Sequence, residues 1–479
     1  MGRVGSSRTY PLSFFGVERV SQPEFVAEDW YRALRLAERA GLLRLEIPFP
    51  SPSAGESERA RRHLDFWKKQ PPFDRDDWLT RRLALDGLDE ASLARLVAVS
   101  PGNLGAALGG PAKWLTALEE AYSPPEWPAA DSLPLSESAR NDPMTGFLNL
   151  VVPLVHRALG SLRAGIGEIA RAGDEACFDP PAAERLLFSG LPQRLLWMLD
   201  RTLVLELNVA RLEGRLSGST PEERFANFAD SLRRREVAMI ILREYPVLAR
   251  QLVECMGTWV DTSLEFLRRL VSDGSVIRST FFGGKDPGRL TEVQAGAGDS
   301  HHGGRSVMIL RFEGDKKLVY KPRSLSVDVH FQELLEWLNR RGDHPPFRLL
   351  KVLDRKSHGW IEFVSPEPCA SEKDVHRYHV RLGGLLAVLY AIGAVDFHFE
   401  NLIAAADQPV PVDLETLFHP RVPRAESENP DERLAVRVLG ESVLRVGLLP
   451  FRVGESEKFA GSDLSGVASV EGKPSADRM

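Results

Sequence analysis

The spacing of apolar residues changes near residue 280. Before that point apolar residues recur at the spacing of amphipathic helices. In residues 193–216, the apolar residues at helical spacing are Leu195, Leu196, Leu199, Leu203, Leu207 and Ala210. Beyond residue 280, short apolar runs are separated by turn residues. The pattern predicts a mostly helical region over 1–280, followed by a region of helices and strands, and so an α+β fold class.

Local boundary signals locate two helices of the first region. Residues 74–87 form one amphipathic segment that ends at a glycine, Gly87. Thr220 is suited to cap a helix, because Pro221 fits the first turn and Glu223, three residues after the cap, completes a capping box. We therefore expect one helix to end near Gly87 and another to begin after Thr220.

The second region predicts two strands, a helix, two more strands, a second helix and a polar loop. The expected elements are a strand over 306–312, a turn over 313–315, a return strand ending at Lys321, a helix over about 328–341, strands over 347–353 and 360–364, and a helix capped at Ser371 that reaches Gly393. In kinases, the N-lobe and the beginning of the C-lobe contain strands, helices and a catalytic loop in this same order. After Pro420 the chain is polar and charged and signals little structure.

The polar loop carries the clearest chemical signal. Its frame is Asp396-x-His398-x-x-Asn401, and Asp413-x-Glu415 follows after an apolar stretch. Phosphoryl transfer needs a carboxylate to orient the attacking hydroxyl, and an Asn and a second Asp to hold Mg²⁺. The frame therefore predicts a phosphotransferase catalytic loop followed by a metal-binding carboxylate. The alternative is a turn whose polar side chains cap backbone groups.

Two short strands predicted over 402–404 and 410–412 flank a turn over 407–409. Such a hairpin would bring Asn401 and Asp413 to one end, as shared metal ligation requires. Upstream, a Gly-rich segment over 296–304 lets the backbone approach phosphates closely, although its spacing is neither the usual kinase one nor that of a P-loop. Lys321 could then reach the α- and β-phosphates. The alternative for Lys321 is an exposed lysine on an edge strand.

Composition narrows the class of protein. The 479 residues suffice for two or three domains, and a net charge of −6 gives no electrostatic support for nucleic-acid binding. No apolar run reaches membrane-spanning length, and the N-terminus has no apolar signal-peptide segment. The three cysteines are far apart, so neither a disulfide framework nor a thiolate zinc site is indicated. We expect a cytoplasmic bacterial protein without membrane or nucleic-acid partners.

Specific stretches resemble the dehydratase domain of class II lanthipeptide (lantibiotic) synthetases, bifunctional enzymes that modify ribosomal precursor peptides. They are residues 298–307, 319–328, 396–403 and 412–418, with weaker likeness over 67–73 and 203–216. The resemblance implies a fold similar to lipid kinases, with a helical region over 1–280, an N-lobe over 281–370 and a C-lobe over 371–479. It also implies that ATP and Mg²⁺ serve to phosphorylate Ser and Thr of the precursor. Elimination of the phosphate then leaves dehydroalanine or dehydrobutyrine.

The resemblance also implies roles for single residues. Lys321 would bind the nucleotide phosphates, Asp396 would be the catalytic aspartate with His398 beside it, and Asn401 and Asp413 would be metal ligands. Glu415 matches a further acidic position of the same motif. Asp299 and His301 resemble a pair that serves phosphate elimination, which needs a base for the α-proton. For a partner of Lys321, Glu333 and Glu336 are candidates, although a solvated helix face is favoured for both.

The family's pattern continues beyond what this chain contains. The resemblance implies that the C-lobe is incomplete, that the zinc-binding cyclase domain is absent, and that a separately encoded C-terminal portion is a possible partner beside the precursor peptide, with its leader and Ser/Thr/Cys-rich core. Two rival functions stay open. One is a kinase without eliminase activity, and the other is a non-catalytic module that binds a leader peptide.

Overall fold

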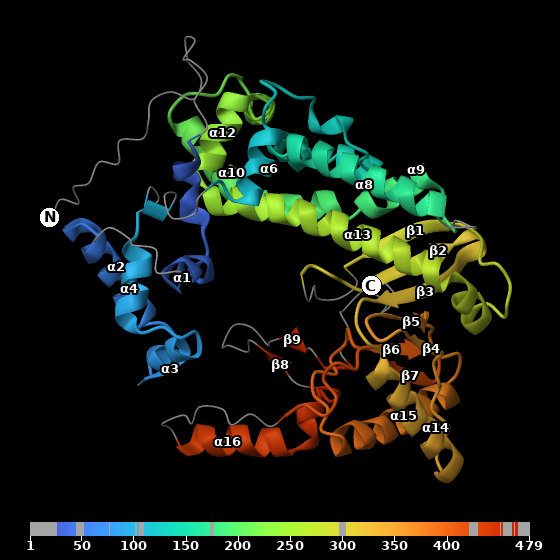
Figure 1. Cartoon of the computed structure of the whole chain (residues 1–479). Helices are drawn as coiled ribbons and strands as arrows, with labels where there is room; N and C mark the ends of the chain where they lie inside the picture. The colour runs from blue at the N-terminus through green and yellow to red at the C-terminus, as the bar shows by residue number, and fades with distance from the viewer. Residues whose placement is uncertain are drawn as a thin grey trace. The chain divides into compact units, whose positions relative to one another are not determined.

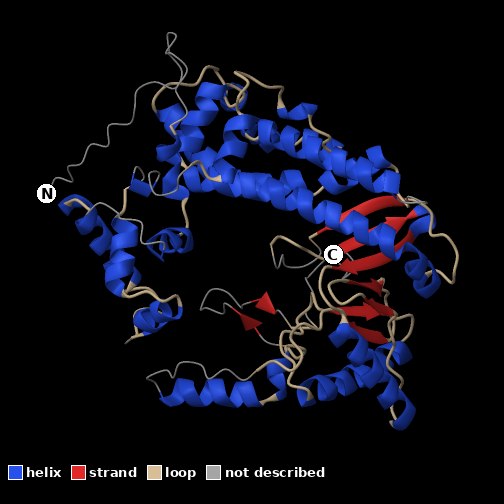
Figure 2. Ribbon diagram, in the orientation of Figure 1, coloured by secondary structure: helices blue, strands red, loops and turns tan. Residues whose placement is uncertain are grey.

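Helices dominate the first part of the chain and a β-sheet appears in the second, as Figures 1 and 2 show, so the α+β class is confirmed. This computed structural model describes residues 26–467 except 45–51, 76, 101–102, 105–109, 173–176, 297–302, 421–429, 451, 454–461 and 464. The chain forms two units. One comprises Met1–Ala172 with Leu187–Leu267, and the other comprises Gly173–Leu186 with Arg268–Met479.

Helices are the main secondary structure of the first unit within its described residues. Its α-helices are α1 (Leu36–Arg44), α2 (Ala54–Trp67), α3 (Trp78–Leu85), α4 (Glu90–Ala98), α6 (Lys113–Ala121), α7 (Glu137–Arg140), α8 (Val152–Ala172), α10 (Leu191–Leu212), α11 (Pro221–Ser231) and α12 (Arg235–Glu244). Two more, α9 (Pro180–Phe188) and α13 (Pro246–Phe281), contribute residues to both units. The helical character expected for residues 1–280 is thus confirmed within the described ranges.

The predicted helix boundaries have the expected local causes. Thr220 and Glu223 form the capping box of α11, with the Thr220 side chain accepting from the Glu223 amide and the Glu223 side chain accepting in return. Of the leucines at helical spacing in α10, Leu195, Leu196, Leu199 and Leu203 are buried, whereas Leu207 is partly exposed. α3 is shorter than the predicted segment, and Gly87 adopts a φ of +69° just after it, which is a conformation that glycine allows.

The second unit contains a five-stranded antiparallel sheet with strand order β1-β2-β3-β5-β4. Its strands are β1 (Leu290–Ala295), β2 (Met308–Phe312), β3 (Lys316–Lys321), β4 (Val352–Asp354) and β5 (Gly359–Glu362). β3 pairs with β2 on one side and with β5 on the other, where Lys321 stands opposite Gly359. The lysine therefore lies on an interior strand, and the edge-strand alternative is wrong.

The two faces of the sheet are buried against different elements. Tyr320 of β3 faces the end of α13, since Arg269 Nη1 of that helix donates to its hydroxyl at 2.6 Å and Asp273 accepts from Trp360 Nε1 at 2.8 Å. Figure 1 shows this end of α13 over the sheet. Successive side chains of a strand alternate between faces, so Val319 and Lys321 point to the other side. Val319 packs there in a core that contains Val410 of the strand pair described next.

The remaining elements complete the second unit around the predicted loop. They are α14 (Ser326–Arg341), α15 (Glu372–Ala391), β6 (Leu402–Ala405), β7 (Gln408–Pro411), α16 (Pro430–Glu441), β8 (Arg452–Val453) and β9 (Ser462–Asp463). A core joins α14 and α15 to the segments before β6 and after β7: Phe331, Leu335, Phe347, Leu382, Leu385, Leu389, Ala394, Phe397, Leu402, Leu414, Leu417, Val446 and Leu448. The loop is therefore anchored to packed helices.

Two expectations differ from the structure. The strand predicted over 347–353 is reduced to β4, because side chains bind the backbone amides that a sheet partner would use: Asn339 Oδ1 accepts from Phe347 and Gln332 Oε1 accepts from Leu350, both at 2.8 Å. The polar stretch after Pro420 signalled little structure, yet residues 430–441 form α16.

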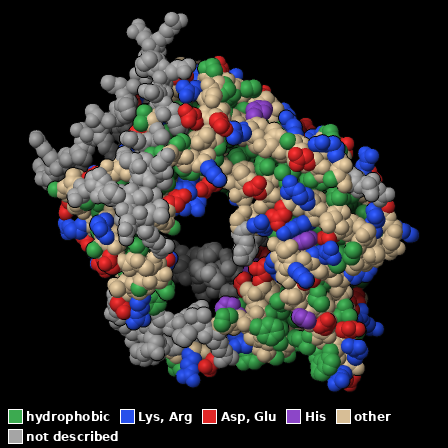
Figure 3. Space-filling view, in the orientation of Figure 1, with side chains coloured by type: hydrophobic (Ala, Val, Ile, Leu, Met, Phe, Trp, Pro, Cys, Tyr) green, Lys and Arg blue, Asp and Glu red, His purple; other side chains and the backbone are tan. Residues whose placement is uncertain are grey.

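Acidic and basic side chains are interspersed over the face of the molecule in Figure 3, in keeping with a composition of 61 Lys and Arg against 67 Asp and Glu. Within the described residues, no helix combines the length and the apolar character that crossing a membrane requires.

Candidate active site

The loop between α15 and β6 is anchored at Phe397. Phe397 is fully buried, and its backbone amide donates to the carbonyl of Val446 at 2.8 Å. The residue before it, Asp396, has a φ of +67°, a conformation uncommon for residues other than glycine, and its side chain is 60% exposed. Backbone strain of this kind clusters at functional sites. The buried anchor thus presents the Asp396 carboxylate to solvent.

Polar contacts inside the loop order the three predicted side chains. Asn401 Nδ2 donates to the Asp396 carbonyl at 2.9 Å and lies 3.3 Å from His398 Nε2. That same His398 nitrogen lies 3.7 Å from Asp396 Oδ1. His398 Nδ1 accepts from the Glu400 amide at 3.3 Å. The loop contains backbone-capping bonds, as the alternative interpretation expected, but it also brings Asp396, His398 and Asn401 together.

The β6–β7 hairpin brings the second half of the motif beside the first. Leu402 pairs with Pro411, and the Val412 amide donates to the Asn401 carbonyl at 3.1 Å. Asp413 therefore follows directly on the residue that is bonded to Asn401. Its Oδ1 accepts from the Glu415 amide at 3.2 Å. The expected hairpin is confirmed.

Lys321 meets this motif from the sheet. The side chain is 6% exposed, and Nζ donates to the Val412 carbonyl at 2.6 Å, one residue before Asp413. Its ion-pair partner is Asp328 at the start of α14, fully buried, with Oδ1 3.7 Å from Nζ. Burial is the largest influence on the pKa of Lys321 and lowers it, while the Asp328 carboxylate opposes the shift. A buried counter-ion therefore supports the charge of this lysine.

Sequence reasoning missed Asp328, although the residue lies in one of the stretches that carry the resemblance. The glutamates weighed as partners point elsewhere: Glu333 pairs with His330 at 2.8 Å and Glu336 with Arg340 at 3.8 Å. The signal that could have found Asp328 is its place in the first turn of the helix after the lysine strand, where a carboxylate is also favoured by the helix dipole.

Arg323 is a second residue that sequence reasoning missed. Nη1 donates to Asp328 Oδ2 at 2.9 Å, Nη2 lies 3.5 Å from Asp413 Oδ1, and Nε lies 2.6 Å from Glu415 Oε1. Burial disfavours its charge, but these carboxylates together raise its pKa. We name Lys321, Arg323, Asp328, Asp413 and Glu415 the charge cluster.

The residues present fit a magnesium ion in chemistry. Mg²⁺ prefers oxygen ligands, and the hairpin pairs the backbone of Asn401 with that of Val412, the residue before Asp413, so that an amide and a carboxylate residue lie at the same end of the hairpin. Because Asn401 uses its Nδ2 within the loop, its Oδ1 is the atom left to face a metal. Among the described residues, no group of three or more His, Cys, Asp or Glu side chains has an arrangement that could hold a metal ion. Asp299 and His301 lie outside the described residues.

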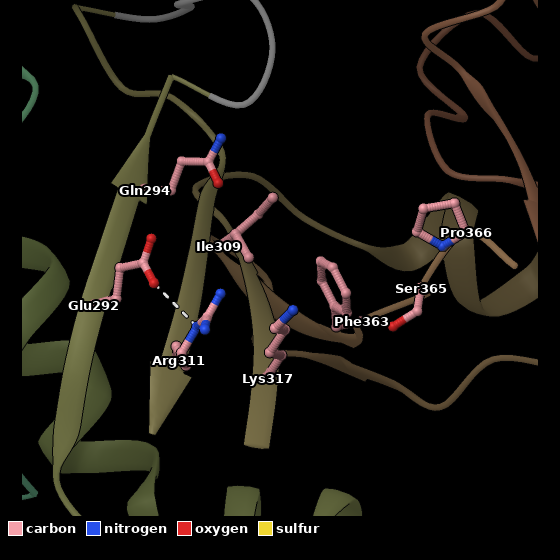
Figure 4. A pocket seen from close by; sticks show the side chains of 8 residues that line it. All are labelled: Glu292, Gln294, Ile309, Arg311, Lys317, Phe363, Ser365 and Pro366. Atoms are coloured by element: carbon pink, nitrogen blue, oxygen red, sulfur yellow. Dashed lines mark ion pairs between the residues drawn. The ribbon is translucent and has the colours of Figure 1, made fainter. Parts of the chain in front are cut away.

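A cavity of about 320 Å³ lies on the face of the sheet to which Lys317 of β3 points (Figure 4). Side chains alternate along a strand, so Lys321, four residues further on, points to the same face. Its walls are Glu292, Gln294, Ile309, Arg311, Lys317, Phe363, Ser365 and Pro366. Figure 4 shows Arg311 paired with Glu292, at 3.0 Å, and Lys317 Nζ lies 4.9 Å from the centre of the Phe363 ring. Lys317 precedes Lys321 by four residues, roughly 13 Å along the strand. The cavity therefore combines apolar walls with polar side chains on the sheet face that carries Lys321.

Asp328→Asn is expected to destabilise the protein by about 3 kcal/mol, because removing one partner of a buried ion pair leaves the cations of Lys321 and Arg323 without their shared carboxylate. Urea denaturation measures the change. Glu333→Gln removes an exposed carboxylate from the same helix, and its effect should stay within about 0.5 kcal/mol. Equal stability of the two variants would show that Asp328 does not hold the cluster.

Comparisons with known proteins agree with the sequence motifs. Residues 245–479 match the family model described as Domain of unknown function (DUF4135). Over 295 residues the chain is 28% identical to the Lacticin 481/lactococcin biosynthesis protein LcnDR2 of Lactococcus lactis subsp. lactis. The match covers 59% of this chain and 31% of that protein, so the chain spans less than a third of the relative's length. The second match relates the chain to a protein of lacticin 481/lactococcin biosynthesis.

Proposed function

We propose that this chain acts in lanthipeptide biosynthesis. It uses ATP and Mg²⁺ to phosphorylate Ser and Thr of a ribosomal precursor peptide, and it then eliminates the phosphate. The observation that carries the proposal is the meeting of three segments at Lys321: the lysine at the end of β3, the Asp328 carboxylate of the following helix, and the chain between Asn401 and Asp413. Kinases use a lysine on the corresponding strand, held by a helix carboxylate, with an Asn and an Asp for the metal.

The transfer step assigns a role to each of these residues. Asp396 orients the Ser or Thr hydroxyl and accepts its proton while the oxygen bonds to the γ-phosphorus of ATP and ADP leaves. His398, beside Asp396, helps to keep that carboxylate in place. Lys321 binds the nucleotide phosphates. Asn401 and Asp413 hold the magnesium ion, which when bound neutralises phosphate charge. Glu415 adds a carboxylate to the same group.

The cavity of Figure 4 is assigned to the base and ribose of the nucleotide. It shares the sheet face with Lys321, and its Phe363, Ile309 and Pro366 side chains offer apolar walls for a flat ring. The nucleotide would then extend from these residues toward the charge cluster.

Elimination is the second half of the proposed reaction. A base removes the α-proton of the phosphorylated residue, the C–O bond to the phosphate breaks, and a carbon–carbon double bond forms. Dehydroalanine results from Ser and dehydrobutyrine from Thr. The resemblance assigns this step to Asp299 and His301. The name of the relative, a lacticin 481/lactococcin biosynthesis protein, supports a modified precursor peptide as the substrate.

Mass spectrometry of a peptide incubated with the full-length protein and Mg-ATP tests the proposal. The substrate is the Ser-, Thr- and Cys-rich precursor encoded nearest to the gene. We expect masses lowered by loss of water, preceded by transient masses raised by phosphate. Phosphopeptide that accumulates without loss of water would indicate a kinase lacking eliminase activity. Peptide binding with neither ATP binding nor ATP turnover would indicate a non-catalytic leader-binding module and would refute the proposal.

A further inference from the structure

Arg323 forms ion pairs with Asp413, a proposed metal ligand, and with the neighbouring Glu415. Its three guanidinium nitrogens each face a different acid: Asp328, Asp413 and Glu415, at 2.9, 3.5 and 2.6 Å. The three acids come from two places in the chain, the first turn of α14 and the segment after β7. The arginine side chain is 22% exposed, and Asp328 is fully buried. The guanidinium therefore bridges the helix after the lysine strand to the motif after the hairpin.

The three contacts differ in how firmly they hold the arginine. The contact to Asp328 is a hydrogen-bonded ion pair with a completely buried carboxylate. The contacts to Asp413 and Glu415 reach side chains that are 44% and 37% exposed. Asp328 is thus the permanent anchor, while the other two carboxylates are accessible to a competing cation from solvent.

Charge balance makes the guanidinium and a metal ion competitors. The charge cluster contains two cations and three carboxylates, so it carries one net negative charge. Arg323 is the cation in contact with Asp413 and Glu415, whereas Lys321 pairs with Asp328 at 3.7 Å and donates to a backbone carbonyl. A divalent ion on Asp413 would take over the neutralisation of that carboxylate and would repel a guanidinium only 3.5 Å from it.

We propose that Arg323 is a nucleotide-binding residue that exchanges partners. Without nucleotide it pairs with Asp413 and Glu415. When the metal arrives with the triphosphate, the arginine remains on Asp328 and turns its freed nitrogens to a phosphate oxygen. Arginine suits this task because its fork of donors matches phosphate geometry. The inference rests on the proposed function. It adds Arg323 as a phosphate ligand that, without nucleotide, neutralises the carboxylates of Asp413 and Glu415.

The exchange predicts effects of opposite sign for one substitution, Arg323→Gln. Without nucleotide, the variant should bind Mn²⁺, a stand-in for Mg²⁺, more tightly than wild type by at least about threefold, because the competing cation is gone. With metal present, its affinity for a non-hydrolysable ATP analogue should fall on the order of tenfold to a hundredfold, the value of a charged hydrogen bond. Its affinity for adenosine, which has no phosphate, should not change.

Electron paramagnetic resonance of Mn²⁺, and titration calorimetry with the ATP analogue and with adenosine, measure these three affinities. Arg340→Gln is the matched control, since that exposed arginine pairs with Glu336 on the other end of α14. Arg323→Lys keeps a cation and should restore much of the triphosphate affinity. Circular dichroism confirms that each variant is folded.

Each outcome decides the inference. Affinities for metal and triphosphate that fall together would show that Arg323 only supports the site's structure. Unchanged affinities, or equal losses for adenosine and the triphosphate, would also overturn the exchange. Nucleotide binding by the wild-type protein distinguishes the two hypotheses. If wild type binds no Mg-nucleotide, the proposed function itself fails. If wild type binds Mg-nucleotide but the Arg323 variant lacks the expected effects, only the partner exchange is refuted.

Discussion

Replacement of Asp396 by asparagine is expected to slow phosphoryl transfer to the precursor peptide on the order of 10²- to 10⁴-fold, the usual contribution of a positioned acid–base group. The carboxylate is the only exposed acid of the loop that lies beside His398 Nε2, within 3.7 Å, and asparagine keeps its shape but not its charge. Affinity for Mg-ATP should stay near that of wild type. Single-turnover transfer of labelled phosphate to the peptide measures the rate.

Glu400→Gln is the matched control for this experiment. Glu400 belongs to the same loop, its side chain is 67% exposed, and it lies 3.9 Å from His398 Nδ1, so the change removes an equal charge from the opposite side of that ring. Its transfer rate should remain within a few-fold of wild type. A transfer rate for the Asp396 variant as high as that of the control would refute the assignment of Asp396 as the catalytic aspartate.

Replacement of Asp413 by alanine is expected to weaken Mg-ATP binding on the order of a hundredfold, with little change in affinity for the peptide. The substitution removes the one carboxylate of the proposed Asn401–Asp413 magnesium site, and phosphate charge near Lys321 then stays poorly neutralised. Titration calorimetry with Mg-ATP measures the loss. Raising the magnesium concentration should recover part of the affinity, because the metal remains bound to the nucleotide.

Asp407→Asn tests whether such a loss comes only from a weakened hairpin. Asp407 lies at the other end of the β6–β7 pair and forms ion pairs with Arg377 at 2.7 Å and Arg381 at 2.9 Å. Removing its charge should destabilise the hairpin without touching the metal side. Unchanged nucleotide affinity in the Asp413 variant, or an equal loss in both variants, would count against metal ligation by Asp413.

Much of the second unit could be predicted because its elements have local causes. The hairpin between Asn401 and Asp413 follows from two short apolar runs around a turn, and Ser371 caps α15 by accepting from the Asp374 amide, as expected. The strand ending at Lys321 follows from its apolar positions. Signals of this kind operate over a few residues, so they can be recognised in the amino-acid sequence alone.

Predictions failed where distant groups decide the outcome. The segment over 347–350 is apolar enough for a strand, but Asn339 and Gln332 of α14 take its amide hydrogens. α16 was not expected because it lies in a polar and charged stretch, and its Leu434 and Val438 remain exposed in the second unit. The intrinsic strand or helix propensity of a segment is a weak guide when contacts with distant residues decide its structure.

By itself, the sequence determined the α+β character, the order of the elements and the polar frame Asp396-x-His398-x-x-Asn401, since period, caps and turns act locally. Only the tertiary structure decided which charges meet. Lys321 touches the carbonyl of Val412, 91 residues away, because the Val319 face of the sheet packs on the hairpin. The same packing makes Asp328, and not the glutamates of α14, the ion-pair partner of Lys321. It also places Arg323 between Asp328 and Asp413. Contacts between distant segments depend on how packed surfaces fit, and residue spacing does not record that fit.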